Sequence, residues 1–346
     1  MSNDLLPLLQ AYYARTFTGR KAACITEMNS INSGWESDVY AFTVEWGPHG
    51  RREREDLILR IYPGADADEK SEKEFTALAR LNEAHYPVPR VDRLERRAFS
   101  PFGKPFLIME RVPGRGMWQP LFHSTPQAYA RLLPLFCGLF VRLHRLDWRA
   151  MIPDAAKYEP HGPYDVVEQE FARWQPFIQA LPLPGFHTAW KWLEAHRRDV
   201  TSDGPVIAHW DFHPENILLK EDGQAVVIDW TGIELTDYRF DLSWTLLLIG
   251  ANDNWALREP VLREYERQAG KPVEGLEFFD AITSYRRLIS VIASIAVGAD
   301  KLGMRPGAEA MMRRQAPSLR RVYEHFLSIT QMTIPEVENF LTEAGV

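Results

Sequence analysis

Hydrophobic and polar residues alternate in several stretches of the first hundred residues. VYAFTVEW (residues 39–46) and DLILRIY (residues 56–62) are rich in β-branched and aromatic residues, and a charged segment separates them. This pattern predicts an antiparallel β-hairpin. Two later runs, RLERRAF and KPFLIMERV, predict a second pair of strands. We therefore expect a small antiparallel β-sheet in the N-terminal part of the chain.

The spacing of apolar residues becomes helical in residues 70–84 and again in most of the chain after residue 116. The first of these helices ends before PVPRV, because proline cannot continue it. Ser124-Thr125-Pro126 predicts the start of another, since proline suits the first helical turn. Amphipathic segments then follow almost to Val346. We expect a β-rich lobe with one helix in residues 1–112 and a mainly helical lobe in residues 113–346.

The stretch HWDFHPENILLKEDGQAVVIDW (residues 209–230) interrupts the helical lobe with a strand-like pattern. Its Asp222-Gly223 pair lies between two apolar runs and predicts a two-residue type I′ turn. In that register Glu221 faces Gln224, and Asn216 faces Asp229, so an amide oxygen and a carboxylate share the open end of the hairpin. Oxygen ligands of this kind suit Mg²⁺. Asp211 lies on the loop that enters the same end, and one carboxylate separate from a ligand pair is what phosphoryl transfer requires.

Composition and charge narrow the class of protein. Of 346 residues, 45% are hydrophobic, which allows a substantial core. The formal net charge of −7 disfavours nucleic acid as a main partner and is compatible with a cationic small molecule. Two distant cysteines predict neither a disulfide framework nor a thiolate zinc site. With no signal peptide and no apolar stretch long enough to cross a membrane, we expect a cytoplasmic protein.

The motif HWDFHPEN resembles the H-x-D-x-x-x-x-N catalytic loop of protein-kinase-like enzymes. With IDW in place of Asp-Phe-Gly, the chain looks most like the aminoglycoside phosphotransferase and choline kinase branch, over roughly residues 20–250. The resemblance implies an α+β, bilobal protein-kinase-like fold. It also implies that Asp211 is the catalytic base, and that Asn216 and Asp229 hold Mg²⁺. His209 and Asp241 would then be structural partners of the loop backbone.

The same resemblance assigns the nucleotide-binding residues to the N-terminal lobe. NSINSGWESDVY (residues 29–40), with Ser33 and Gly34, would cover the phosphates through backbone N–H groups. The strand position that holds a lysine in this family is Arg60 here, and Glu74 on the following helix is its expected partner. FLIMERV matches the hinge, so Glu110 and Val112 would offer backbone groups to the purine.

Only eleven residues separate Asp229 from Asp241, too few for a regulatory activation loop. The expected activity is therefore transfer of the γ-phosphate of ATP or GTP to a hydroxyl of a small molecule, such as an aminoglycoside-like antibiotic or a related metabolite. Acidic residues of the helical lobe could bind a cationic acceptor, and tryptophans could frame a quaternary ammonium or an apolar face. These candidates are Glu168, Glu170, Asp237, Asp253 and Glu259, with Trp174, Trp190, Trp192 and Trp255.

Two other interpretations stay open from the sequence. His209, Asp211 and His213 alternate along an extended loop and could converge on zinc in a metal-dependent hydrolase. Arg60 and the glycine-poor phosphate loop would also suit a nucleotide-binding pseudoenzyme. Each site residue also has a structural reading: Asp211 as a loop cap, Asn216 and Asp229 as a polar cross-strand pair. His213 is expected to be a loop residue with no chemical role, and His144 to be a satisfied core or helix-end histidine.

Overall fold

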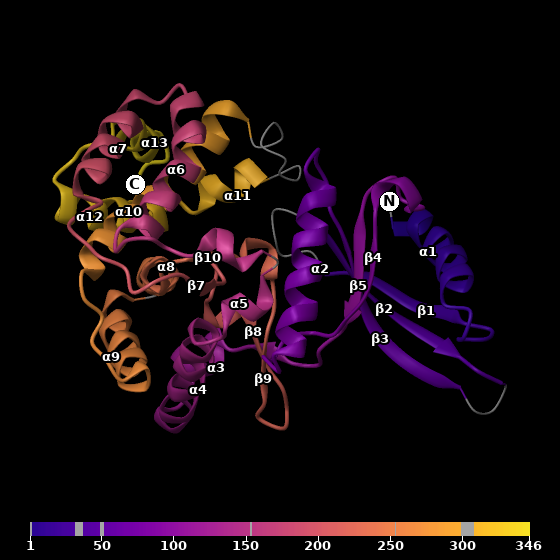
Figure 1. Cartoon of the computed structure of the whole chain (residues 1–346). Helices are drawn as coiled ribbons and strands as arrows, with labels where there is room; N and C mark the ends of the chain where they lie inside the picture. Colours follow the sequence, from indigo (N-terminus) through magenta and orange to yellow (C-terminus); the bar gives the residue numbers. More distant parts are fainter. Residues whose placement is uncertain (1, 32–36, 49–51, 153, 253, 299–307) are drawn as a thin grey trace. The chain divides into compact units, whose positions relative to one another are not determined.

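The chain forms two compact units in a computed structural model that describes residues 2–31, 37–48, 52–152, 154–252, 254–298 and 308–346 (Figure 1). The first unit gathers residues 1–115 with residues 218–231, and the second holds residues 116–217, 232–298 and 309–346. The first unit therefore recruits a stretch that the chain reaches only after it has entered the second. The division predicted from the sequence, after residue 112, placed that stretch in the helical lobe.

The first unit is built on a five-stranded antiparallel sheet in the order β1-β2-β3-β5-β4. The two predicted strand pairs are confirmed, since β2 pairs with β3 and β4 pairs with β5. The register of the first pair sets Val39 opposite Arg60. The strands are β1 (Cys24–Ser30), β2 (Asp38–Trp46), β3 (Glu53–Ile61), β4 (Val91–Glu95) and β5 (Phe106–Glu110).

Two helices cover opposite faces of this sheet, as Figure 1 shows: α1 (Ser2–Thr16) and α2 (Ala67–Glu83). Successive side chains of a strand point to opposite faces. Leu57, Leu59 and Ile61 of β3 pack into an apolar cluster with Tyr12 and other residues of α1. Arg60, which lies between Leu59 and Ile61 in the strand, points to the opposite face, which α2 covers. The helix predicted over residues 70–84 is α2, whereas α1 was not predicted.

The stretch at residues 217–227 forms the predicted hairpin from β8 (Ile217–Leu219) and β9 (Ala225–Val227), but the predicted turn is wrong by one residue. The Lys220 N–H donates to the Gln224 carbonyl (2.8 Å), and the Gly223 N–H donates to the Lys220 carbonyl (3.0 Å). Only Gly223, with φ of 83°, adopts the left-handed conformation in this loop. A type I′ turn needs two such residues, so a three-residue loop forms instead. The Asp222 carboxylate stabilises it by accepting the Gln224 N–H (2.9 Å).

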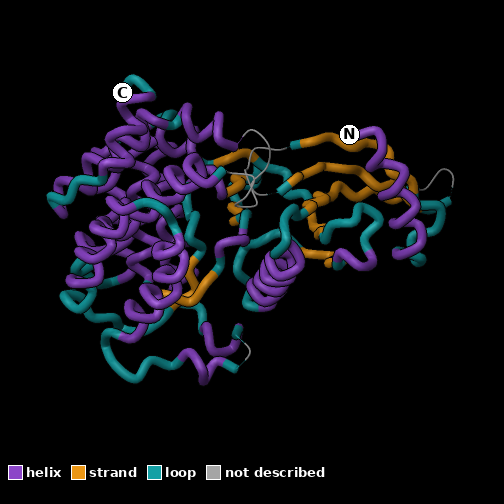
Figure 2. The backbone as a smooth tube through the Cα atoms, turned by 90° about the horizontal axis from the view of Figure 1, so that it is seen from above, coloured by secondary structure: helices purple, strands orange, loops and turns teal. Residues whose placement is uncertain are grey.

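The second unit is mainly helical, as the sequence predicted, and Figure 2 shows its helices in purple. The Thr125 hydroxyl caps α4 by accepting the Ala128 N–H (3.1 Å), with Pro126 in the first turn, which confirms the predicted helix start. A short strand pair, β7 (Val206–Ala208) with β10 (Glu234–Thr236), flanks residues 209–233. The larger helices are α4 (Pro126–His144), α6 (Asp165–Ala180), α7 (Pro184–His196), α8 (Tyr238–Asn252), α9 (Arg258–Ala269), α10 (Leu276–Val297), α12 (Ala316–Thr330) and α13 (Pro335–Glu343).

Short elements complete the chain: β6 (Arg115–Gly116), α3 (Trp118–Phe122), α5 (Trp148–Met151) and α11 (Ala308–Arg314). Within the ranges that the structure describes, no helix is both long and apolar enough to span a membrane. The two cysteines differ in environment: Cys24 is exposed at the start of β1, while Cys137 is buried in α4. Burial raises the pKa of the Cys137 thiol well above its ordinary value.

Candidate active site

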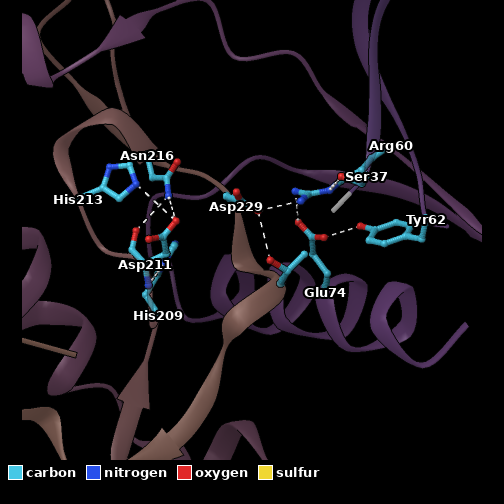
Figure 3. Close-up of polar contacts among 10 residues, drawn as sticks. Ser37, Arg60, Tyr62, Glu74, His209, Asp211, His213, Asn216 and Asp229 are labelled. Atoms are coloured by element: carbon cyan, nitrogen blue, oxygen red, sulfur yellow. Dashed lines mark hydrogen bonds and ion pairs between the residues drawn. The ribbon is translucent and has the colours of Figure 1, made fainter. Parts of the chain in front are cut away.

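The first unit contains a cluster of charges around Arg60, which extends from β3 toward α2 (Figure 3). Its guanidinium donates to three oxygens: Ser37 Oγ (2.9 Å), Glu74 Oε1 (3.0 Å) and Asp229 Oδ1 (2.8 Å). The ion pair with Glu74 that the sequence predicted is therefore present. The planar fork of arginine makes the third contact possible, because it presents several donors at fixed directions.

Glu74 is the most buried carboxylate of this cluster, with a side chain only 1% exposed. Burial raises the pKa of Glu74, although the nearby Arg60 charge opposes that shift. The second carboxylate oxygen accepts the hydroxyl of Tyr62. Glu74 is thus held from two sides and fixes the direction in which Arg60 points.

Burial also disfavours the charge of Arg60, but the carboxylates of Glu74 and Asp229 outweigh it and raise the pKa of the guanidinium. Arg60 therefore supplies a permanent cation. The bonds of Asp229 run through Oδ1, to Arg60 and to the hydroxyl of Thr231 (3.4 Å). The roles of Arg60 and Glu74 toward a nucleotide stay predictions.

In the second unit, Asp241 of α8 accepts hydrogen bonds from the loop that connects β7 to the short 3-10 helix η3 (Pro214–Asn216). The Asp241 carboxylate accepts the backbone N–H groups of His209 (2.6 Å) and Trp210 (2.8 Å). His144 contacts the same carboxylate through Nε2 (3.3 Å) and Tyr265 through Nδ1 (2.8 Å). The expectations that Asp241 and His209 are structural partners of the loop, and that His144 is a satisfied helix-end histidine, are confirmed.

Trp210 has a left-handed backbone, with φ of 62°, in this loop. That conformation is unfavourable for a bulky residue and persists only where its surroundings impose it. The bond from its N–H to Asp241 is one such constraint. The following residue, Asp211, donates its own N–H to His209 Nδ1 (3.2 Å). Buried anchors on both sides therefore fix the backbone from which the Asp211 side chain projects.

The Asp211 carboxylate is surrounded by hydrogen-bond donors (Figure 3). Its Oδ2 accepts from Asn216 Nδ2 (3.0 Å) and lies 3.4 Å from His213 Nε2, while Oδ1 accepts from Trp244 Nε1 (3.3 Å). Burial would raise the pKa of Asp211, but the neighbouring His213, His209 and Trp244 together hold it well below its ordinary value. This carboxylate is ionised at neutral pH and can accept a hydrogen bond from a hydroxyl.

The structure bears on two sequence interpretations of the histidines. That His213 has no chemical role stays a prediction, although its Nε2 lies 3.4 Å from Asp211 Oδ2 and helps to lower the pKa of that carboxylate. The zinc interpretation of His209, Asp211 and His213 is not supported, since within the described ranges no three metal-binding side chains gather at one point. The His209 ring is fully buried, and its Nδ1 already accepts the Asp211 N–H.

The remaining nucleotide-binding predictions have different outcomes. Ser33 and Gly34 lie outside the described residues. Glu110 ends β5, and its backbone N–H donates to the Arg90 carbonyl (2.8 Å), so that N–H is already used within the sheet. Val112 follows the end of the strand. Hinge contacts with a purine stay a prediction.

The acidic residues expected to bind a cationic acceptor are engaged within the protein where the structure describes them. Each of the four contacts cationic or neutral donors of the chain: Glu168 with Arg198, Glu259 with Arg263, Asp237 with Arg239, and Glu170 with Trp174, Thr236 and Arg173. Asp253 lies outside the described residues.

Of the candidate tryptophans, Trp174 has its ring centroid 6.2 Å from that of Trp210, the residue before Asp211. Trp190 is buried against Phe171, Trp192 stacks on His196, and Trp255 lies beside His325. Sequence reasoning missed Trp210 and Trp244. Trp210 stood inside the motif already quoted, whereas nothing in the sequence marks Trp244 as a neighbour of Asp211.

Comparison with known protein families gives one match that covers most of the chain. The model of the phosphotransferase enzyme family matches residues 27–279. The match includes Arg60, Glu74, Asp211, Asn216 and Asp229, and so contains both charge clusters.

Solved structures with the same fold span nearly the whole chain. A putative aminoglycoside phosphotransferase from Ralstonia eutropha JMP134 has a TM-score of 0.63 at 18% identity, with 98% of each chain covered. Choline kinase LicA from Streptococcus pneumoniae has a TM-score of 0.59 at 13% identity, over 94% of this chain and 99% of that one. A thermostable mutant of aminoglycoside phosphotransferase APH(4)-Ia, in ternary complex with AMP-PNP and hygromycin B, gives 0.53 at 17% identity, over 91% and 97%.

Proposed function

The chain belongs to the phosphotransferase enzyme family, and we propose that it transfers the γ-phosphate of ATP or GTP to a hydroxyl of a small molecule. The observation that carries this proposal is the state of Asp211. Its carboxylate is ionised, fixed by a braced loop and surrounded by donors that leave it able to accept a further hydrogen bond. A group of this kind orients an acceptor hydroxyl.

The proposed reaction breaks the bond between the γ-phosphorus and the bridging oxygen, and the nucleoside diphosphate leaves with that oxygen. The acceptor oxygen forms the new bond to phosphorus. Its proton passes to an Asp211 carboxylate oxygen and then to solvent. Because the transition state of phosphoryl transfer is loose, the proton transfers late, as the phosphoryl bond forms, rather than before attack. The main contribution of Asp211 is therefore orientation of the hydroxyl.

The side chains proposed for magnesium have suitable donors. Bound Mg²⁺ would neutralise developing charge on the transferred phosphates. Asn216 uses its Nδ2 on Asp211 and so turns its amide oxygen away from that carboxylate. Asp229 forms its bonds through Oδ1, and among the described residues its Oδ2 has no hydrogen bond or ion pair. We infer that Asn216 and Asp229 are the metal ligands, and that Arg60, held by Glu74, positions the phosphates.

The direct test is acceptor-dependent release of nucleoside diphosphate by the purified chain with Mg²⁺. ATP and GTP are each assayed with aminoglycosides, choline, sugars, hydroxy acids and their phosphate esters. The Asp211→Asn variant serves as the inactive control and Asp222→Asn, at the hairpin turn, as the matched active one. Release that depends on an acceptor and disappears only in Asp211→Asn supports the proposal.

Nucleotide binding without transfer to any acceptor would instead favour the pseudoenzyme interpretation. That alternative rests on the arginine at position 60, where the family has lysine. The bond from Arg60 to Asp229 also supports the pseudoenzyme interpretation, because the arginine occupies one oxygen of a proposed metal ligand. Binding of the nucleotide that is insensitive to Mg²⁺ would mark this outcome.

A further inference from the structure

The two oxygens of the Asp211 carboxylate are not equivalent (Figure 3). Oδ2 accepts the side-chain N–H of Asn216 (3.0 Å) and also faces His213 Nε2 at 3.4 Å. Oδ1 accepts the indole N–H of Trp244 (3.3 Å). The Asp211 side chain is 43% exposed, so a small molecule can reach the carboxylate. An acceptor hydroxyl therefore meets two oxygens with different hydrogen-bonding capacity.

The tautomer of His213 determines how much capacity Oδ2 retains. Its Nδ1 accepts the backbone N–H of Glu215 (3.2 Å), so the proton of the neutral imidazole is on Nε2. The nitrogen that faces Asp211 is thus a donor. A carboxylate oxygen has about two lone-pair sites, and Asn216 and His213 account for both sites on Oδ2.

Oδ1 retains a lone pair for a further donor. Within the residues that the structure describes, Trp244 is the one hydrogen-bond donor to this oxygen. The indole occupies one of its lone-pair sites, and the second is left for a hydroxyl. The atom of Asp211 that can receive a substrate hydroxyl is therefore the atom that Trp244 holds.

Trp244 is itself held in place. It is buried in α8, and the guanidinium carbon of Arg286 lies 4.7 Å from its ring centroid. Neighbouring side chains of α8 bind the catalytic loop on both sides of the carboxylate. Asp241 accepts backbone N–H groups before it, and the Thr245 hydroxyl donates to the Phe212 carbonyl after it (2.6 Å). One helix thus holds both the loop backbone and the Oδ1 atom.

We propose that Trp244 is a positioning residue and that the acceptor hydroxyl binds at Asp211 Oδ1, beside the indole N–H. This inference rests on the proposed function and adds the residue that orients its proton acceptor. As the acceptor oxygen bonds to phosphorus and the nucleoside diphosphate leaves, the hydroxyl proton passes to Oδ1. The indole N–H opposes rotation of the carboxylate about its Cβ–Cγ bond, and so keeps the remaining lone pair in one direction.

A first test requires no acceptor. In a proton–nitrogen correlation spectrum of the full chain, the indole resonance of Trp244 is identified by its loss in Trp244→Phe. We expect Asp211→Asn to move this resonance upfield, because the amide oxygen carries no full charge and accepts a weaker hydrogen bond. Asp222→Asn, at the hairpin turn, should leave it in place. A Trp244 resonance that does not respond to Asp211→Asn would overturn the proposal.

A second test measures kinetics with the nucleotides and the acceptor panel of the diphosphate-release assay. Trp244→Phe keeps an aromatic ring but removes the N–H. We expect kcat to fall about 10-fold, the lower end of the value of a hydrogen bond to a charged group. Both KM values should stay nearly unchanged, because the indole acts on the carboxylate rather than on a substrate.

Trp148→Phe is the matched control for the loss of an indole. Trp148 is also buried in the second unit, and the guanidinium carbon of Arg149 lies 4.5 Å from its ring centroid. This variant should keep the original kcat, with thermal unfolding showing that both variants are folded. A folded Trp244→Phe with unchanged kcat, or with a loss confined to KM, would overturn the proposal.

The two tests distinguish this inference from the proposed function. Absence of transfer to every acceptor, with an indole resonance that responds to Asp211→Asn, would remove the kinase activity and with it the hydroxyl position, but not the contact between Trp244 and Asp211. Transfer that requires Asp211 and is unaffected by Trp244→Phe would support the proposed function and overturn the role of Trp244.

Discussion

Asp211 and Asp229 belong to different units but have similar exposure, with side chains 43% and 36% accessible. Their partners differ. Asp229 is paired with the permanent cation of Arg60, while Asp211 accepts from the neutral donors of Asn216 and Trp244 and lies beside His213. In a carboxylate paired with arginine, one oxygen is held in a strong charge-assisted hydrogen bond. A carboxylate that accepts only from neutral donors is held less strongly, so it can still accept a hydrogen bond from a substrate hydroxyl.

The most direct test of these different roles is to remove each carboxylate in turn. Asp211→Asn is expected to lower kcat by about 10²- to 10⁴-fold, because an amide cannot accept the acceptor proton. Mg²⁺-dependent nucleotide binding should persist in that variant. Asp229→Ala is expected to lose the Mg²⁺ dependence of nucleotide binding, measured by calorimetry at several Mg²⁺ concentrations. If the two variants lose the same property, the division of roles is incorrect.

A second prediction concerns the burial of the Arg60 cluster. Glu74→Ala removes the buried carboxylate that pairs with Arg60 and accepts the Tyr62 hydroxyl, and we expect a loss of about 3–5 kcal/mol in the free energy of unfolding. The matched control is Glu72→Ala on the same helix, whose carboxylate is 52% exposed and paired with Arg96. That change should cost about 1 kcal/mol or less. Urea unfolding of both variants gives the comparison, and equal losses would contradict it.

Arg60→Lys tests whether the wide arginine fork competes for Asp229. A lysine ammonium is a compact point charge and cannot reproduce all three contacts of the guanidinium. With Asp229 released, we expect Mg²⁺ to bind the nucleotide complex about 2- to 5-fold more tightly, since a partly exposed ion pair contributes about 1 kcal/mol or less. Unchanged or weaker Mg²⁺ affinity would show that Arg60 does not compete for this carboxylate.

The smallest predicted effect comes from His213→Gln. The pKa of Asp211 is lowered in the folded chain, so its ionisation stabilises the fold above the unfolded value of about 3.9, and this contribution disappears as pH falls through the folded pKa. Loss of the imidazole raises that pKa. We expect unchanged turnover at pH 7, with the acid limb of the kcat profile shifted to higher pH. An unshifted acid limb would exclude a role for His213 in this ionisation.

Residue patterns along the chain predicted most elements near the site. Alternation located β2 and β3, helical spacing located α2, and Thr125-Pro126 located the start of α4. These features depend on neighbours within a few residues. The family resemblance, and not local spacing, placed Glu74 beside Arg60, and the ion pair is present in the structure.

Features that depend on tertiary contacts could not be predicted in this way. The hairpin turn was misplaced because Asp-Gly permits two turn types, and the Asp222 side chain selected the longer one through Gln224. Likewise, the sequence shows that Glu168 and Asp237 are acidic, but it does not show that they form ion pairs with Arg198 and Arg239. The contacts of Arg286 with Trp174, Trp210 and Trp244 join α10 to α6, to the loop after β7 and to α8, and no local pattern links those segments.

The two thiols differ in accessibility, and this difference allows selective labelling of the enzyme. Cys24 is exposed on the sheet unit, whereas Cys137 is buried in α4 with a raised pKa and so presents little thiolate. A maleimide dye should therefore label the unmodified chain at a single, known position. With a second dye on the nucleotide, energy transfer would report in real time when the nucleotide arrives and departs, without any engineered cysteine.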